Sequence, residues 1–399
     1  MRRSAHFNRV PVRRTSRSAP RWAGLEARRT LLLLVPLLLL AQPVERKGPF
    51  FERVIYGNVG AHPRLRINAH GPVILQAGAG REISYSVRVS VRARSEAEAR
   101  ATIQRYRVTA EHQNGWLVLT APGGPVITNV IVKAPRLETA TIFTSDGDVE
   151  AAGVDGNLTV DSGGGDLNVD RIRGDCKLYT VGGDVTIGAV GGRMQCSTGA
   201  GKITVNTVKG PCVLETVGGD IQAKEIGGPL RAETGGGGIH IIRALSTVSA
   251  GTRGGPIVVD HAAGIVTARN MAGPVQVGEA PGVHCESGSG GIRLNNISGA
   301  MRVSTSLGNI MAALLSGKFE DSILSTGNGD VTVIIPSNVG VNIRAQNDLA
   351  DTLRRISTDY RTITVRRQGR QLVGEGPVNG GGPLLQISAS VGTIFIRKQ

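Results

Sequence analysis

Apolar residues recur along most of the chain with a period of about 18 residues. The series is formed by the apolar residue that follows each Gly-Asp pair or its equivalent: Val149, Leu167, Val185, Ile203, Ile221, Ile239, Ile257, Val275, Ile292, Ile310 and Val331. Successive members are 18 residues apart seven times, and then 17, 18 and 21 residues apart. Half a period away, a glycine such as Gly174 or Gly192 opens a second short apolar run. A fixed period of this length predicts a repeat architecture.

Within each unit, apolar and polar residues alternate, and this alternation predicts strands. In one unit Ile203 and Val205 are apolar while Thr204 between them is polar, and Leu230 and Ala232 alternate in the same way in a second run. Equal units that bury their apolar face only by stacking form a solenoid. We therefore predict an all-β fold, a single-stranded parallel β-helix with 18-residue rungs about 4.8 Å apart. Right-handed coiling is the default for parallel crossovers, and a left-handed β-helix, which also occurs with 18 residues per turn, is the alternative.

The two ends of the chain depart from the repeat. Residues 42–145 contain the strand-like segments RLRINAHGPVILQAG, ISYSVRVSVRA and GWLVLTAP. Ser95-Glu96-Ala97-Glu98 is a capping box that predicts a helix of about ten residues. We expect this segment to be a small α+β cap over the open edge of the first rung, because uncovered edges aggregate. The solenoid then spans residues 146–335.

Residues 336–399 are predicted to cap the C-terminal end. Two further strands follow Val331 in VTVIIPSNVGVNIRAQ, and a short helix is expected over 348–356. Residues 345–380 are interpreted as an excursion from the ladder. The tail PLLQISASVGTIFI copies the rung pattern, with Gly392-Thr393-Ile394 in the place of Gly-Asp-Val. We expect it to form the last rung and to close that end.

Composition and charge agree with a repetitive exported protein. Of the 399 residues 56 are glycine and only 3% are aromatic, which suits tight turns and small stacked side chains. Residues 1–47 hold eleven Arg or Lys and two Glu, and so carry +9 of the net +15. The remaining +6 shows no basic element interleaved with aromatic residues, so we expect no nucleic-acid partner.

The basic head leads into an apolar segment at residues 31–41, LLLLVPLLLLA. Eleven residues are too few to span a membrane but suit the core of a signal peptide. A buried helix is the alternative, and Pro36 argues against it. We predict that 1–41 is a signal peptide and that the mature protein has no stable membrane span. Its expected location is the periplasm, the cell surface or the extracellular space.

Two columns of polar residues accompany the repeat. Hydroxyl or amide side chains precede the glycine pairs: Ser162, Thr180, Thr198, Thr216, Thr234, Thr252, Asn270, Ser287, Thr305 and Thr326. Stacked in this way they can bond along the ladder and cap the turns. A second column contains Asp148, Asp166, Asp184, Asp220 and Asp330, interrupted by other residues such as Lys202. We interpret these Asp as turn-stabilising, with calcium at the first three as the alternative.

Glu215 and Glu233 are the strongest candidates for catalysis. They fall at equivalent outward positions of adjacent rungs, near Arg231. Two carboxylates about 5 Å apart suit a retaining glycosidase, but a solvated charged face is the favoured interpretation. Tyr179, the nearest aromatic residue, is two rungs from Glu215. His240 and His284 face outward in different strands, and residues 235–238 lack the lysine of a phosphate loop. We predict no catalytic, cofactor-binding or metal-binding residue, and no cofactor.

The register also predicts the state of the four cysteines. Cys176 and Cys212 share an inward column two rungs apart, and Cys196 lies between their rungs but two residues along the strand. Cys285 falls in the Cys196 column five rungs away. A disulfide needs Cα atoms within about 7 Å, so we expect four buried free thiols.

The repeat resembles a known family. Its pattern TxGGDIxVxxIGGxLxAxT, present as TVGGDVTIGAVGGRMQCST and TVGGDIQAKEIGGPLRAET, is similar to the bacterial putative-adhesin family of β-strand-repeat proteins. The resemblance spans about 145–335, and LQISASVGTIFIRK in the tail is similar too. It implies an exported β-solenoid with an adhesion or envelope role and supplies no catalytic residue.

We therefore expect an exported, non-enzymatic scaffold, structural or adhesion-like. Its partner would be a protein or glycan of the envelope or extracellular surface. A polysaccharide-active enzyme, either a glycoside hydrolase or a lyase, and a periplasmic envelope-sensing module are the alternatives.

Overall fold

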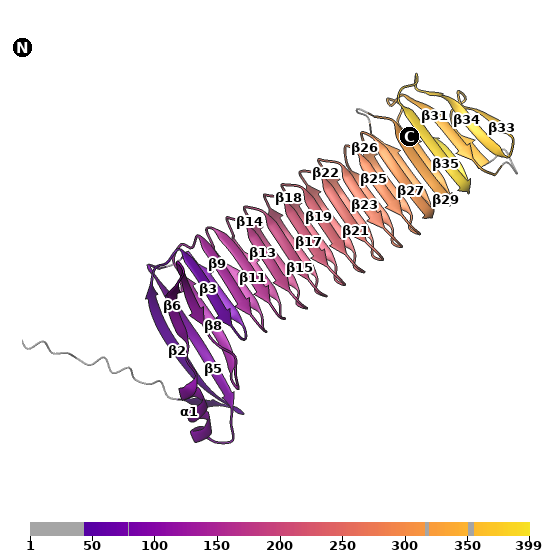
Figure 1. The fold of residues 1–399 in the computed structure, drawn as a ribbon. Helices are drawn as coiled ribbons and strands as arrows, with labels where there is room; N and C mark the ends of the chain where they lie inside the picture. Colours follow the sequence, from indigo (N-terminus) through magenta and orange to yellow (C-terminus); the bar gives the residue numbers. More distant parts are fainter. Residues whose placement is uncertain (1–43, 79, 316–318, 350–354) are drawn as a thin grey trace, which may run out of the picture. The chain divides into compact units, whose positions relative to one another are not determined.

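A computed structural model describes residues 44–78, 80–315, 319–349 and 355–399 (Figure 1). The predicted signal peptide at 1–41 lies outside these residues. The described residues form one compact unit, built on two long and mostly parallel sheets. One turn of chain supplies one strand to each sheet, so the predicted parallel β-solenoid is confirmed. The hand of the coil stays a prediction.

Sheet A contains the first strand of each rung. In spatial order its parallel strands are β8 (Ile127–Ala134), β4 (Val73–Ala77), β10 (Val149–Ala152), β12 (Leu167–Asp170), β14 (Val185–Val190), β16 (Ile203–Val208), β18 (Ile221–Ile226), β20 (Ile239–Ala244), β22 (Ile257–Ala262), β24 (Val275–Glu279), β26 (Ile292–Ile297), β28 (Ile310–Leu314), β30 (Val331–Ile335), β36 (Ile394–Lys398) and β32 (Ile356–Thr358).

Sheet B contains the second strand of each rung. Its parallel strands are β7 (Trp116–Thr120), β3 (Arg64–Ala69), β9 (Thr139–Thr144), β11 (Asn157–Ser162), β13 (Cys176–Thr180), β15 (Met194–Thr198), β17 (Cys212–Thr216), β19 (Leu230–Thr234), β21 (Val248–Thr252), β23 (Val266–Asn270), β25 (Val283–Ser287), β27 (Met301–Leu307), β29 (Ser322–Asn328), β35 (Leu384–Val391) and β31 (Val341–Asn347).

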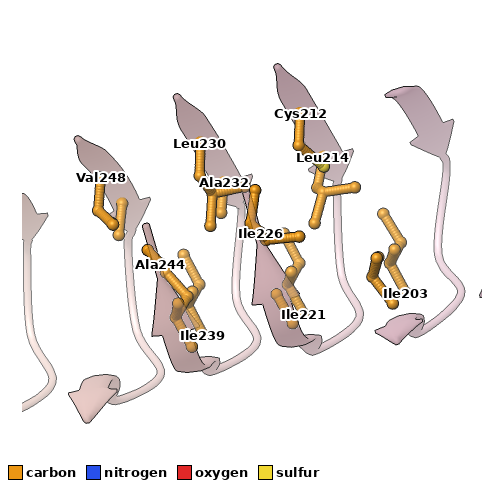
Figure 2. Close-up of a cluster of buried hydrophobic side chains, with 14 of the residues drawn as sticks. Ile203, Cys212, Leu214, Ile221, Ile226, Leu230, Ala232, Ile239, Ala244 and Val248 are labelled. Atoms are coloured by element: carbon orange, nitrogen blue, oxygen red, sulfur yellow. The ribbon is translucent and has the colours of Figure 1, made fainter. Parts of the chain in front are cut away.

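The core is a narrow layer between the two sheets. Val185, Ile203, Ile221 and Ile239 stand in one in-register column and are at most 1% exposed, as the period predicts. Figure 2 shows such columns from both sheets pointing toward one another, among them Ile226 of sheet A and Leu230 of sheet B. Small or branched side chains nest on their own copies, which explains why so few aromatic residues are needed.

The N-terminal segment extends the ladder as well as covering its end. The sequence predicted a small cap over the open edge of the first rung. In this segment β3 and β4 pair in parallel with β9 and β10, and β7 and β8 lie beyond them. Antiparallel strands then follow: β5 (Glu82–Arg92) on β8, β2 (Phe50–Gly60) on β5, β1 (Glu45–Lys47) on β2, and β6 (Thr109–Gln113) on β7.

The capping box predicts the helix of this segment correctly. Helix α1 (Glu96–Arg105) begins after Ser95, whose side chain accepts from the backbone N–H of Glu98. The Glu98 carboxylate accepts in return from the backbone N–H of Arg94. Ala99 and Ile103 are the buried positions of this helix.

The C-terminal tail forms a rung, but not the last one. Strands β35 and β36 lie between β29/β30 and β31/β32, so β31 and β32 are farther out than the tail. Both edges of β35 find strand partners there, as buried backbone groups require. The predicted excursion at 345–380 is also corrected, because β34 (Gln371–Val378) pairs antiparallel with β31, and β33 (Thr364–Gln368) with β34.

Of the helix expected over 348–356, Arg355 has 3-10 helical backbone, and Ile356 already begins strand β32. Residues 350–354 of that prediction lie outside the described part. Ile356 is buried and pairs in parallel with Ile394 of the neighbouring rung.

Candidate binding surface

A buried ladder of hydroxyl and amide groups fixes the turns from the inside. The Thr216 hydroxyl donates to Gly201 O of the preceding rung at 3.0 Å and accepts from the Gly219 N–H at 3.2 Å. Thr198 and Thr234 repeat the same pair of bonds, and Asn270 makes the equivalent contact with Gly255 O. These side chains are at most 6% exposed. The structural interpretation of the column is confirmed.

The Asp column joins one rung to the next on the outside of the turns. Asp148 Oδ1 accepts from the Asp166 N–H, and Asp166 Oδ1 from the Asp184 N–H, both at 2.8 Å. Asp184 continues the series to Lys202, and Asp330 to Thr393 in the tail. One oxygen of each carboxylate is thus engaged by backbone, which supports the turn-stabilising interpretation. Within the described residues no three His, Cys, Asp or Glu side chains cluster as metal ligands would.

The four thiols are free and buried, as the register predicts. Leu178 pairs with Cys196, and Met194 with Cys212, so the cysteines are staggered between rungs. Burial raises the pKa of Cys176, Cys212 and Cys285 to about 12, and it also raises the pKa of Cys196. Such thiols are poor nucleophiles and poor metal ligands at neutral pH.

Outside the core, sheet B carries in-register columns of outward residues, and one of them is mostly polar with an exposed tyrosine. Its members, from one rung to the next, are Tyr179, Ser197, Glu215, Glu233, Gly251, Arg269 and Glu286. Six steps of about 4.8 Å make this column about 29 Å long. It lies on the odd-numbered strands from β13 to β25, which are labelled in Figure 1.

A groove follows the middle of this column. One depression, of about 540 Å³, is lined by Ser197, Glu215, Glu233, Gly251 and the two arginines Arg253 and Arg269. A second, of about 360 Å³, shares Thr252 and Arg269 with it and continues to Glu286 and Gly288. The two open depressions therefore adjoin along the ladder, and together they are called the groove.

The structure places the two predicted carboxylates side by side. Glu215 and Glu233 are direct partners across β17 and β19, and their side chains are 47% and 44% exposed. Arg231 pairs with Glu233 at 2.8 Å and lies 3.9 Å from Glu215. Both carboxylates therefore share a cation in open solvent, whereas a general acid needs a restricted site that raises its pKa.

The sequence did not single out Gly251, Arg253 or Arg269. The period did contain a signal, because Gly251 falls between polar residues in its column and Arg269 falls one rung before Glu286. In the structure Arg269 and Glu286 lie 3.4 Å apart. What the sequence could not show was that they line the same depression as the two glutamates.

His240 and His284 lie on different strands and different sheets, as predicted. His240 of sheet A lies 3.0 Å from Asp260, and His284 of sheet B lies 3.1 Å from Glu286. These are surface pairs.

A separate pocket of about 410 Å³ lies at the N-terminal end, between the last turn of α1 and residues 122–126. Tyr106 lines it, and burial raises the pKa of this tyrosine to about 12. Within the described part of the chain its hydroxyl has no hydrogen-bond partner.

The ladder of two sheets and the open groove on sheet B define a repeat scaffold. No protein-family model and no curated protein matches the chain. In the part of the chain described here, no helix has the length and apolarity needed to cross a membrane.

Solved structures are similar to the chain. A putative adhesin from Bacteroides fragilis is 14% identical, with 71% of this chain and 97% of that chain covered and a TM-score of 0.26. A putative adhesin from Parabacteroides distasonis is 10% identical, with 86% and 96% covered and a TM-score of 0.29. A putative cell adhesion protein from Clostridium sporogenes is 10% identical, with 87% and 100% covered and a TM-score of 0.16. These similarities concern the fold alone and place no functional residue.

Proposed function

We propose that the protein is an exported, non-enzymatic, adhesion-like scaffold that binds an extended partner along the outward face of sheet B. The observation that carries this proposal is the groove formed by two adjoining open depressions between Ser197 and Gly288. It runs along the ladder, so its shape matches a polymer or an extended segment better than a compact small molecule.

Rigidity supports a binding role. Every strand under the groove is hydrogen-bonded to a rung on each side, and the Thr and Asn ladder holds its turns. A preorganised surface loses little conformational entropy when a partner binds. Export rests on the Arg-rich head and the apolar segment at 31–41.

An enzyme is the second candidate, and Glu215 with Glu233 is the observation that favours it. Paired carboxylates on neighbouring strands are the residue types that glycoside hydrolysis uses, but both side chains are about half-exposed and share Arg231. Neither side chain is enclosed in the water-restricted cleft that acid–base catalysis uses, so binding is the better-supported function.

Charge reversal in the groove tests the proposal. Binding of the purified chain to isolated bacterial envelopes and to extracellular polysaccharide would be compared for wild type, Arg253→Glu and Arg269→Glu. Arg293→Glu is the matched control, because Arg293 is exposed on strand β26 of sheet A. We expect both groove variants to lose binding and the control to retain it. Equal binding by all four chains would contradict a role for sheet B.

A further inference from the structure

Gly251 occupies a strand position where packing does not require glycine. Glycine weakens a strand interior, and there it often marks a close approach by another molecule. At Gly199 and Gly235 an added Cβ would lie 2.1 and 2.2 Å from a carbonyl oxygen of the preceding rung. At Gly251 it would meet only Glu233 Cγ, at 3.7 Å, which is an ordinary contact. The missing side chain therefore opens the surface without relieving a clash.

The opening is a notch with opposite charges on its two sides. Gly251 lies directly between Glu233 on β19 and Arg269 on β23, and Arg253 follows at the turn. A ligand seated there meets hydrogen-bond acceptors on one side and guanidinium donors on the other. Because acidic and basic side chains line the same depression, neither a polyanion nor a polycation meets uniformly complementary charge.

This surface offers no backbone pairing to a peptide strand. The backbone groups of β19, β21 and β23 are already paired with neighbouring rungs on both sides, so no edge is free for β-augmentation. A partner must be recognised by side chains alone. An uncharged hydroxyl group both donates and accepts hydrogen bonds. It can therefore donate to the carboxylates and accept from the guanidinium groups of the same surface.

An aromatic platform stands in line with the notch. Tyr179 is 46% exposed and pairs with Ser197, the first groove residue of the column. Four rungs, or about 19 Å, separate Tyr179 from Gly251, which is room for several sugar units. A ring of this kind can stack on the apolar face of a sugar while its hydroxyl stays in water.

We propose that the sheet B groove binds an uncharged glycan chain, with one sugar in the Gly251 notch and another on Tyr179. This inference rests on the proposed binding function and names its ligand class. Glu233 would accept from sugar hydroxyls, and Arg253 and Arg269 would donate to sugar oxygens.

A glycan array of neutral, acidic and amino-sugar oligosaccharides, probed with the full chain, tests the ligand class. A neutral oligosaccharide retained by wild type would then be titrated against Gly251→Leu, Tyr179→Ala and Gln222→Leu. Gln222→Leu adds the same side chain to the outward face of sheet A, on β18. We expect affinity to fall about tenfold or more for Gly251→Leu and severalfold for Tyr179→Ala, with no change for Gln222→Leu.

The outcomes separate this inference from the proposed function. If no neutral glycan is retained, or if Gly251→Leu binds one as well as wild type does, the glycan inference is overturned. If the groove charge reversals still abolish envelope binding in that case, the binding scaffold survives with another ligand. Should Gly251→Leu fail to fold, Gly251→Ala serves instead, because its methyl group makes only an ordinary contact with Glu233. A smaller but measurable loss of affinity is then expected.

Discussion

Asp184 donates its backbone N–H to Oδ1 of Asp166, one rung earlier, at 2.8 Å, and its own Oδ1 accepts from the Lys202 N–H at 2.7 Å. The same side chain position thus links three successive rungs. Because these bonds run along the ladder, they add to the backbone pairing at a point where the chain turns.

Asp184→Ala should lower the free energy of unfolding by about 1 kcal/mol, because the Lys202 N–H loses its acceptor. Urea unfolding followed by circular dichroism would measure the change. Asp184→Asn keeps an Oδ1 acceptor and should retain most of the stability. If Asn and Ala were equally destabilising, the hydrogen bond would not be the source of the effect.

Thr216→Val tests the buried ladder. The substitution preserves shape but leaves Gly201 O and Gly219 N without their side-chain partner, so we expect a loss of about 1–3 kcal/mol in unfolding free energy. Thr216→Ser, which keeps the hydroxyl, should cost less. A valine variant as stable as wild type would show that the hydroxyl column does not support the turns.

Stability should fall at alkaline pH because of the buried thiols. Burial raises the pKa of Cys285 from 9.0 to about 12, so the thiol deprotonates at lower pH in the unfolded chain than in the folded one. The contribution of the buried thiol to the free energy of unfolding is complete below about pH 8.5. It is lost as pH rises toward 12, by about 1.4 kcal/mol per pH unit. Urea titrations from pH 7 to 10.5 should show a shallower decline for Cys285→Val than for wild type. Identical slopes would refute the assignment.

The same burial predicts slow thiol chemistry. A thiol reagent should modify none of the four cysteines of the native chain rapidly at pH 7.5, and all four in denaturant. Mass spectrometry of the native protein should also find no intramolecular disulfide. A disulfide between Cys196 and either neighbour would contradict the register.

Removal of the tail from residue 383 onward should destabilise the whole C-terminal end. Strands β29 and β31 would both lose their partner β35, and β30 would lose β36. We expect rapid proteolysis after residue 335 and a tendency to aggregate through the freed edges. Ile394→Ala, which keeps the backbone pairing but removes a fully buried side chain, should destabilise less than the deletion. Protease resistance of the truncated chain equal to that of wild type would show that the tail is dispensable.

Polysaccharide turnover distinguishes the enzyme alternative. Because Glu215 and Glu233 are exposed and share Arg231, we expect no hydrolase or lyase activity on common polysaccharides, and only a modest electrostatic effect on binding when both become Gln. Reducing-end assays of wild type beside Glu215→Gln and Glu233→Gln would measure this. Robust activity that disappears in either variant would establish catalysis.

The sequence by itself determined the repeating part of the molecule. The pairing of Val185 with Ile203, the buried Thr216 and the staggered Cys176 and Cys196 all follow from one period, because each contact joins a residue to its equivalent one rung away. Such contacts recur at a fixed spacing and so appear directly in the hydrophobic pattern. The capping box at Ser95 was equally local.

Only the tertiary structure decided the order of the end rungs and the shape of the groove. β3 pairs with β9 and β35 with β29 across long stretches of chain, so no period records these contacts. The terminal strands insert where both of their edges can be paired, a choice governed by backbone hydrogen bonding across the whole ladder. The groove likewise depends on free space above Gly251 and on arginines from two neighbouring rungs, and side-chain volume in three dimensions is not encoded in alternation alone.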